Sequence, residues 1–255
     1  MPIKIEKITF NYLDWQANAF KILPLGEDQQ KDALAIFTHG YTGHKGQIVN
    51  WGTLLAEQGI PSLVFDLPGH YLGSFNEVQD FRKFKAHAHE LFSEIFRITG
   101  AVLHKSTLIL GGHSLGAFLA LKALSLPVFA THRKLAICVG LGLQAMDTKH
   151  ILETPYFKTV LDWRSQLVSP ALGPDNIFPW PKEEKNTLST FGQRVHLICG
   201  EDDVAVGPTG AEEMKLLLES LHNRVTLEKL ARLPHHQPEL AAVLIKNFIQ
   251  KEGLF

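Results

Sequence analysis

The sequence predicts an α/β fold, in which a mainly parallel sheet of about eight strands is covered by helices on both faces. Short continuous apolar runs, typical of strands buried on both sides, alternate along the chain with longer stretches of helical spacing. The first two runs follow each other without a helix between them, so we expect that pair to be antiparallel. Residues 1–255 are expected to form a single domain.

The expected strands are apolar runs that end in glycine, proline or other turn residues. They are residues 4–12, 18–25, 34–38, 62–65, 107–110, 135–143, 195–199 and 225–230. Helices are expected where apolar residues recur every three to four positions. They are residues 48–58 (closed by Gly59), 79–102, 115–124, 150–167 and 238–251, the last beginning at a proline, which suits a first helical turn.

The interval 144–190 breaks the alternation of strands and helices. It contains one expected helix, 150–167, followed by a stretch that is rich in proline. An interval of this length in a compact domain usually carries function rather than forming a bare loop. We therefore expect a small lid or cap insertion at about 144–190 that folds over a binding site.

The overall composition is that of an ordinary globular protein. The formal net charge is −1 and the basic residues are scattered, so nucleic acid is not expected as a partner. No apolar run approaches the ~20 residues that span a bilayer, and the chain does not open with a secretory signal pattern. A cytoplasmic location is expected, with Cys138 and Cys199 as buried free thiols.

Residues 112–116 have the pattern Gly-x-Ser-x-Gly, with Ser114 at the centre. An apolar strand precedes the pattern and a helix rich in Ala and Leu follows it, which is the context that exposes a nucleophilic serine on a sharp turn. Glycines are needed on either side because a Cβ would collide with the crossing chain. Ser114 is therefore the predicted nucleophile, and the adjacent His113 is expected to be a packing residue.

Three segments, residues 112–116, 39–43 (His-Gly-Tyr-Thr-Gly) and 66–70 (Asp-Leu-Pro-Gly-His), resemble the α/β-hydrolase superfamily. The order of the expected elements agrees with that fold over nearly the whole chain. The His-Gly-Tyr-Thr-Gly segment is most similar to the branch of lysophospholipase-like and feruloyl-type esterases. The resemblance implies a serine hydrolase whose nucleophile, acid and histidine follow in that order along the chain.

The predicted acid lies after the strand at 195–199. The sequence there, Gly-Glu-Asp-Asp-Val-Ala-Val, is similar to the family's Gly-x-x-Asp-x-x-Val turn, which places the acid at Asp203. Asp202 is the nearest alternative and Glu201 a weaker one. Asp147, which follows the preceding strand, would serve as the acid in some branches of the family.

The family's histidine belongs between the last strand and the last helix, where His235 and His236 are adjacent. The His-x-Pro pattern favours His236, and the distance to the final helix favours His235; we prefer His236. A metal site is not expected, because adjacent side chains point apart and no third ligand is fixed nearby. No cofactor is expected either.

Attack on a carbonyl creates an oxyanion that needs preorganised N–H donors. The amide of Leu115, directly after the nucleophile and at a helix start, is expected to be one donor. The resemblance places the second donor at the amide of Tyr41.

Aromatic residues of the insertion, Phe157, Trp163 and Trp180 among them, are expected to give an apolar wall of the substrate pocket. No arginine cluster is available for a charged substrate. We therefore predict hydrolysis of a small to medium apolar acyl or aryl ester, a small-molecule substrate, through an acyl-enzyme. The protein is expected to be a monomer or a homodimer.

Other functions on the same three residues remain open: thioesterase, amidase, acyltransferase and C–C bond hydrolase. A receptor-type binding protein with slow turnover is a second class of alternative. An inactive scaffold is disfavoured by the complete set of serine, acid and histidine. The serine nucleophile argues against a dehalogenase or an epoxide hydrolase, both of which would use an aspartate.

Overall fold

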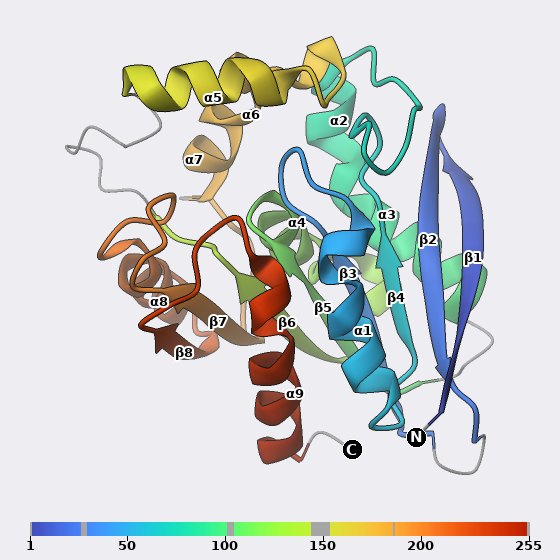
Figure 1. The fold of residues 1–255 in the computed structure, drawn as a ribbon. Helices are drawn as coiled ribbons and strands as arrows, with labels where there is room; N and C mark the ends of the chain where they lie inside the picture. The colour runs from blue at the N-terminus through green and yellow to red at the C-terminus, as the bar shows by residue number, and fades with distance from the viewer. Residues whose placement is uncertain (1, 27–29, 101–104, 144–153, 186, 254–255) are drawn as a thin grey trace.

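The protein is described here by a computed structural model that covers residues 2–26, 30–100, 105–143, 154–185 and 187–253. Its centre is one eight-stranded sheet in the order β1-β2-β4-β3-β5-β6-β7-β8 (Figure 1). The strands are β1 (Ile3–Tyr12), β2 (Trp15–Pro24), β3 (Ala33–Thr38), β4 (Ser62–Phe65), β5 (Thr107–His113), β6 (Arg133–Val139), β7 (Arg194–Gly200) and β8 (Arg224–Leu230).

The sheet is mainly parallel, as predicted. Only the pairs β1–β2 and β2–β4 are antiparallel, and every pair from β4 to β8 is parallel. Parallel strands all end at the same edge of a sheet, so the turns that follow β3, β5, β7 and β8 are brought together there. This edge positions the candidate site.

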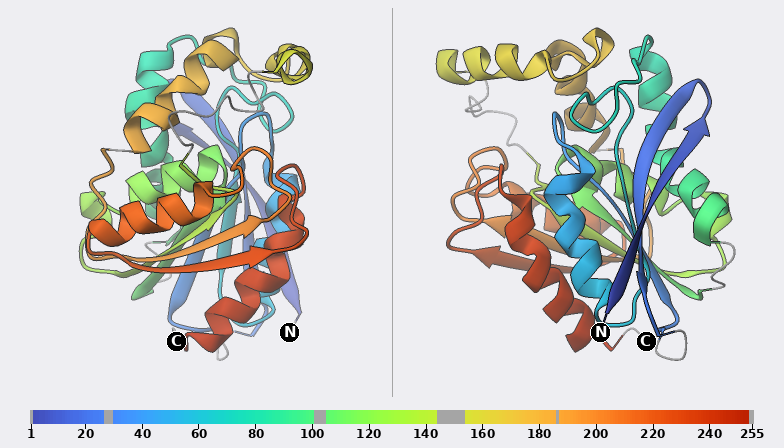
Figure 2. Two further views of the ribbon diagram at one scale, coloured as in Figure 1. Left: turned by 90° about the vertical axis from the view of Figure 1, so that its left-hand side faces the viewer. Right: turned by 45° about the vertical axis from the view of Figure 1, so that its right-hand side comes forward.

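Helices cover both faces of the sheet (Figure 2). The described helices of the main body are α1 (Val49–Ala56), α2 (Phe81–His87), α3 (Leu91–Ile95), α4 (Leu115–Ala123), α8 (Gly210–Ser220) and α9 (Ala242–Lys251). Buried residues of α1 and α9 form one apolar core, and those of α2, α3, α4 and α8 form the other. Neighbouring strand residues enter opposite cores: Leu108 and Leu110 join the second, and Ile109 joins the first.

Two helical stretches differ from the prediction. The segment expected as one helix at 79–102 is divided into α2, a 3-10 turn at Ala88–Glu90, α3 and a π turn at Phe96–Gly100. Helix α8 was not predicted, although Ala211, Met214 and Leu218 recur at helical spacing and are buried. Its first residue is a glycine and it carries several charges, which weakened the pattern.

The interval between β6 and β7 contains three short helices, called here the insertion (described residues 154–185). They are α5 (Pro155–Ser165), α6 (Pro174–Ile177) and α7 (Pro179–Lys185), each beginning with a proline at a position where its missing N–H is harmless. The first residues of the helix expected at 150–167, and Asp147, lie outside the described residues.

The insertion is attached to the loop that follows β4. The Ser169 amide donates to the Gly69 carbonyl at 2.8 Å, and the Ser169 hydroxyl accepts from the Val78 amide at 2.8 Å. Trp180 of α7 is 1% exposed and packs edge-on against Phe84 and Phe118 of the main body. These contacts hold α6 and α7 over the edge of the sheet at which β3 and β5 end (Figure 1).

Candidate active site

Ser114 lies on a sharp turn between β5 and α4. Its backbone has φ 50° and ψ −111°, a conformation that residues with a Cβ seldom adopt. The turn is closely packed: a Cβ on Gly112 would lie 2.5 Å from the Thr38 carbonyl oxygen, and one on Gly116 would lie 2.5 Å from the His39 carbonyl oxygen. The two glycines of the motif are therefore required by the crossing chain.

Three side chains from distant parts of the chain meet at this turn. The Nε2 atom of His235 lies 3.1 Å from the Oγ atom of Ser114. The Nδ1 atom of the same ring lies 2.9 Å from Oδ2 of Asp203. The other oxygen of Asp203 accepts from the amides of Ala205 and Val206, both at 3.0 Å, so the buried carboxylate is fixed in place. The arrangement forms a continuous serine–histidine–carboxylate chain.

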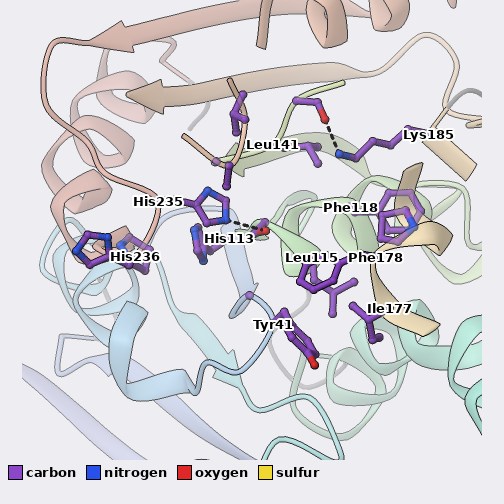
Figure 3. Close-up of a pocket in the computed structure, with 18 of the residues that line it drawn as sticks. Tyr41, His113, Leu115, Phe118, Leu141, Ile177, Phe178, Lys185, His235 and His236 are labelled. Carbon is purple, nitrogen blue, oxygen red and sulfur yellow. Dashed lines mark hydrogen bonds between the residues drawn. The ribbon is translucent and has the colours of Figure 1, made fainter. Parts of the chain in front are cut away.

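The preference for His236 over His235 is corrected by this geometry. Among the described contacts, only the ring of His235 is hydrogen-bonded to Ser114 and Asp203. His236 lines the same pocket but points away from the serine (Figure 3). The two residues lie in a tight turn, closed by a 3.0 Å hydrogen bond from the Gln237 amide to the Pro234 carbonyl, and neighbouring side chains in such a turn diverge.

The alternative acids have other contacts. Asp202 Oδ1 accepts from the Leu233 amide at 2.8 Å, so Asp202 supports the loop that carries the histidine instead of touching its ring. Glu201 is exposed on the turn.

His113 packs directly against His235, with 4.7 Å between the ring centroids. Burial, and then the neighbouring His235, hold the pKa of His113 well below its ordinary value, so its ring is neutral. A Cβ on Gly40 would lie 2.6 Å from His113 Nδ1, which explains why glycine follows His39. His113 therefore fills the space behind His235 and keeps that ring against Ser114.

The predicted oxyanion donors belong to the turns after β3 and β5. Within the part of the chain that the structure describes, neither the Tyr41 nor the Leu115 amide donates to a protein acceptor, so both are available. The Tyr41 hydroxyl donates to the Leu172 carbonyl at 3.0 Å and thereby joins this turn to the insertion. His39 fixes the turn from below, because its Nε2 accepts from the Leu67 amide at 3.0 Å.

Ser114 and His235 open into a pocket with a volume of about 320 Å³. Its wall is mostly apolar. The apolar lining residues are Leu115, Phe118, Leu141, Leu143, Leu161, Ile177, Phe178, Pro181, Ala205, Val206 and Pro238. The insertion contributes four of them, Leu161, Ile177, Phe178 and Pro181.

The three aromatic residues predicted to line the pocket do not line it. Trp163 is 67% exposed on α5, and Trp180 is 1% exposed in the core below the insertion. Phe157 contacts the ring of Tyr156 on α5. Helical spacing predicted the helix α5, but the spacing does not say which of its side chains face the pocket.

Two basic residues of the insertion, Arg164 and Lys185, also line the pocket, and no sequence pattern predicted them. Arg164 Nε donates to the Thr42 hydroxyl at 2.8 Å, next to the Tyr41 turn. Lys185 lies at the other end of the lining and donates to the Gly142 carbonyl (Figure 3). Both occur in segments without a motif, so only their position in the folded chain identifies them.

The described residues include no group of three or more His, Cys, Asp or Glu that could hold a metal ion. In the same residues, no helix has both the length and the apolar character needed to cross a bilayer.

The family model described as "Alpha/beta hydrolase family" matches residues 35–242. The chain belongs to this family, which agrees with the mainly parallel eight-stranded sheet. No curated protein sequence matches the chain significantly.

Solved structures with the same fold cover nearly the whole chain. Est1E from Butyrivibrio proteoclasticus with ferulic acid bound has a TM-score of 0.66 at 14% identity, over 97% of this chain and 100% of that one. The esterase Pf2001 from Pyrococcus furiosus has a TM-score of 0.63 at 16% identity, over 98% and 93%. A thioesterase domain from the curacin biosynthetic pathway has a TM-score of 0.64 at 16% identity, over 97% and 99%. At these identities the likeness is one of fold.

Proposed function

We propose that the protein hydrolyses carboxylic esters through an acyl-enzyme on Ser114. The observation that carries this proposal is the hydrogen-bonded chain from Ser114 through His235 to Asp203, open to a mostly apolar pocket. A serine hydroxyl becomes a useful nucleophile only when a positioned imidazole takes its proton, and the carboxylate holds that imidazole in the required tautomer.

In the first half of the proposed reaction, Ser114 Oγ attacks the carbonyl carbon of the ester while His235 Nε2 takes the hydroxyl proton. The negative charge that develops on the carbonyl oxygen is stabilised by the amides of Tyr41 and Leu115. The bond from the carbonyl carbon to the alcohol oxygen then breaks. His235 gives its proton to the departing oxygen, and the acyl group remains bound to Ser114.

In the second half, a water molecule attacks the acyl-enzyme and His235 takes one of its protons. The bond to Ser114 Oγ breaks, and the proton returns to that oxygen. The balance is one ester and one water consumed, and one carboxylic acid and one alcohol formed. Asp203 stays ionised throughout and stabilises the transient imidazolium.

The walls of the pocket support a small to medium substrate. A volume of about 320 Å³ is near the lower end of ligand pockets, and the lining is mainly aliphatic and aromatic. The insertion forms one side of this wall, so we include in the proposal that it acts as a lid. Thioester hydrolysis is the principal alternative. The same chemistry would cleave a thioester, because the two reactions differ only in whether an alcohol or a thiol leaves.

The test is covalent labelling with a fluorophosphonate, followed by mapping of the modified peptide. We expect one adduct on Ser114, absent in Ser114→Ala and present in a control variant of the exposed serine on the main body, Ser125→Ala. Esters of graded chain length and their thioester counterparts are then compared by kcat/KM. Absence of an adduct on Ser114 would contradict the proposal, and turnover confined to a single cycle would favour the receptor-type alternative.

A further inference from the structure

Lys185 is the last residue of α7 and presents its ammonium group to the candidate active-site pocket. It lies near Leu141 and Phe118, at the side of the pocket away from His235 (Figure 3). Within the described residues its hydrogen-bond partner is the main-chain carbonyl of Gly142. An ammonium has three N–H donors, so this contact leaves donors for a ligand.

The charge of Lys185 is not balanced by the protein in the part of the chain that the structure describes. No carboxylate there lies within ion-pair distance of its Nζ. The neighbouring Glu184 is paired with Lys122, with 2.5 Å between the charged atoms. Among the described lining residues of the pocket, the one with a carboxylate is Glu213. Its Oε1 accepts a hydrogen bond from the Thr209 hydroxyl at 2.8 Å and is not paired with Lys185.

Burial lowers the pKa of Lys185 to about 8, so the amine is still mainly protonated at neutral pH. A partly desolvated cation without a counter-ion is unfavourable in the empty protein. An anionic group delivered by a ligand would remove that unfavourable contribution and form a charge-assisted hydrogen bond. Its place in the pocket wall, with one of three donors used by the Gly142 carbonyl, leaves the ammonium accessible to such a group.

The reaction limits which part of the substrate can reach Lys185. His235 must protonate the leaving oxygen, so the alcohol portion lies on the side of His235. This leaves the opposite side of the pocket, where Phe118, Leu141 and Lys185 lie, for the acyl chain (Figure 3). Apolar walls suit the methylene groups, and the ammonium suits a negative charge at the chain end.

We propose that Lys185 binds a carboxylate at the far end of the acyl group, so that the preferred substrates are half-esters of short dicarboxylic acids. This inference rests on the proposed ester hydrolysis. It refines the expectation of an apolar acyl or aryl group, because a lysine lies in the otherwise mostly apolar wall. Arg164, the other basic lining residue, donates a hydrogen bond to the Thr42 hydroxyl beside the oxyanion turn. It is the alternative residue that could bind the carboxylate.

The experiment uses monoethyl esters of dicarboxylic acids from succinate to adipate. Each is paired with the neutral ethyl ester in which an isopropyl group replaces the terminal carboxylate, so that size is matched and charge alone differs. The readout is the ratio of kcat/KM for the charged ester to that for the neutral ester, from released ethanol. We expect a ratio above one for at least one chain length in the wild type, reduced by roughly tenfold to hundredfold in Lys185→Met.

Three further variants locate the effect. Lys185→Arg should retain most of the ratio because the charge is kept, and Lys158→Met, the same change at an exposed position of α5, should leave the ratio at the wild-type value. A ratio that does not change in Lys185→Met, or one lost in Arg164→Gln instead, would overturn the assignment to Lys185. A wild-type ratio of one or below at every length would overturn it as well.

A binding measurement distinguishes failure of the proposed anion site from failure of the proposed ester hydrolysis. Ser114→Ala, which cannot form an acyl-enzyme, is titrated calorimetrically with each monoethyl ester from succinate to adipate and with its neutral isostere. Tighter binding of a charged compound that is lost in the double variant with Lys185→Met supports the anion site, even if no ester is turned over. Equal binding of the charged and the neutral compound at every chain length would reject it.

Discussion

The backbone of Ser114 is held in a conformation that costs about 1–3 kcal/mol for a residue with a side chain. Contacts around the turn offset this cost. The Ser114 amide donates to the Val139 carbonyl at 2.8 Å, and glycines at 112 and 116 let the chain after β3 pass against the turn. The result is that Oγ stands clear of its own backbone and meets His235. The same backbone conformation of Ser114 therefore causes both the strain of the turn and the exposure of its nucleophilic oxygen.

The adjacent histidines allow a matched test of the proposed base. His235→Ala should lower kcat/KM by about ten thousandfold or more, because Ser114 loses its proton acceptor. His236→Ala removes the same ring from the next residue and should change kcat/KM by less than about tenfold, since it leaves the Ser114–Asp203 connection intact. Steady-state hydrolysis of one p-nitrophenyl ester measures both. A larger loss in His236→Ala would contradict the assignment.

The sequence predicts some of these residues much better than others. Ser114 and Asp203 stand in short local patterns whose backbone geometry is nearly fixed, and the structure places both side chains on the same histidine. His235 and His236 differ only by one position in a turn. Which of them faces the serine depends on the backbone angles of residues 234–237, and residue types do not determine those angles.

At the level of helices, the insertion is anchored by α7 and presents an open face on α5. Trp180 of α7 packs against the rings of Phe81, Phe84 and Phe118 of the main body. Trp163, on α5, is 67% exposed. We therefore expect Trp180 to contribute much to the stability of the protein and Trp163 to contribute little.

Substitution of the two tryptophans should separate those roles. Trp180→Ala leaves a large cavity and should lower the free energy of unfolding by about 3–5 kcal/mol. Trp163→Ala removes an exposed ring and should change it by no more than about 0.5 kcal/mol. Urea unfolding followed by circular dichroism measures both values. Similar losses in the two variants would mean that α5 packs its tryptophan against the protein in solution.

Helical periodicity predicts where helices occur more reliably than what they face. The spacing in 150–167 correctly indicated α5, yet the aromatic side of this helix does not line the pocket, and Leu161 and Arg164 do so instead. A charged side chain such as Lys185, in a proline-rich stretch, belongs to no period at all. Its contribution depends on where α7 docks, and that is decided by the distant contact of Trp180 with Phe84 and Phe118.

On the scale of the whole molecule, the parallel sheet assembles the site from turns far apart in sequence. The turns after β3, β5, β7 and β8 supply the Tyr41 amide, Ser114, Asp203 and His235 in that order. This arrangement follows directly from the alternation of apolar runs and helices, which is why the fold was predictable from one sequence. It also surrounds the site with buried histidines, since His39, His70 and His113 all lie at the same edge.

Those buried histidines should make the whole protein sensitive to mild acid. Burial lowers the pKa of His39 and His70 to about 3 and also lowers that of His113, against an ordinary value of 6.5. Between these limits the unfolded chain binds protons that the folded chain excludes. The contribution of these neutral rings to the free energy of unfolding is therefore present above about pH 6.5. It is lost as the pH falls below that value, by about 1.4 kcal/mol per pH unit for each ring.

Replacement of one ring tests this dependence. Among the described residues, His70 Nε2 has no hydrogen-bond partner, and Nδ1 contacts the Pro68 carbonyl at 3.1 Å, so the ring is held mainly by packing. From pH 6 to pH 5 the free energy of unfolding should fall less steeply in His70→Phe than in the wild type. The difference between the two slopes should be about 1.4 kcal/mol per pH unit. Phe84→Leu, beside His70, should lower stability at every pH and leave the slope unchanged, because it removes packing without removing a titrating group. Urea unfolding at pH 5, 6 and 7 gives the slopes, and an equal slope in His70→Phe and the wild type would show that His70 does not control the acid response.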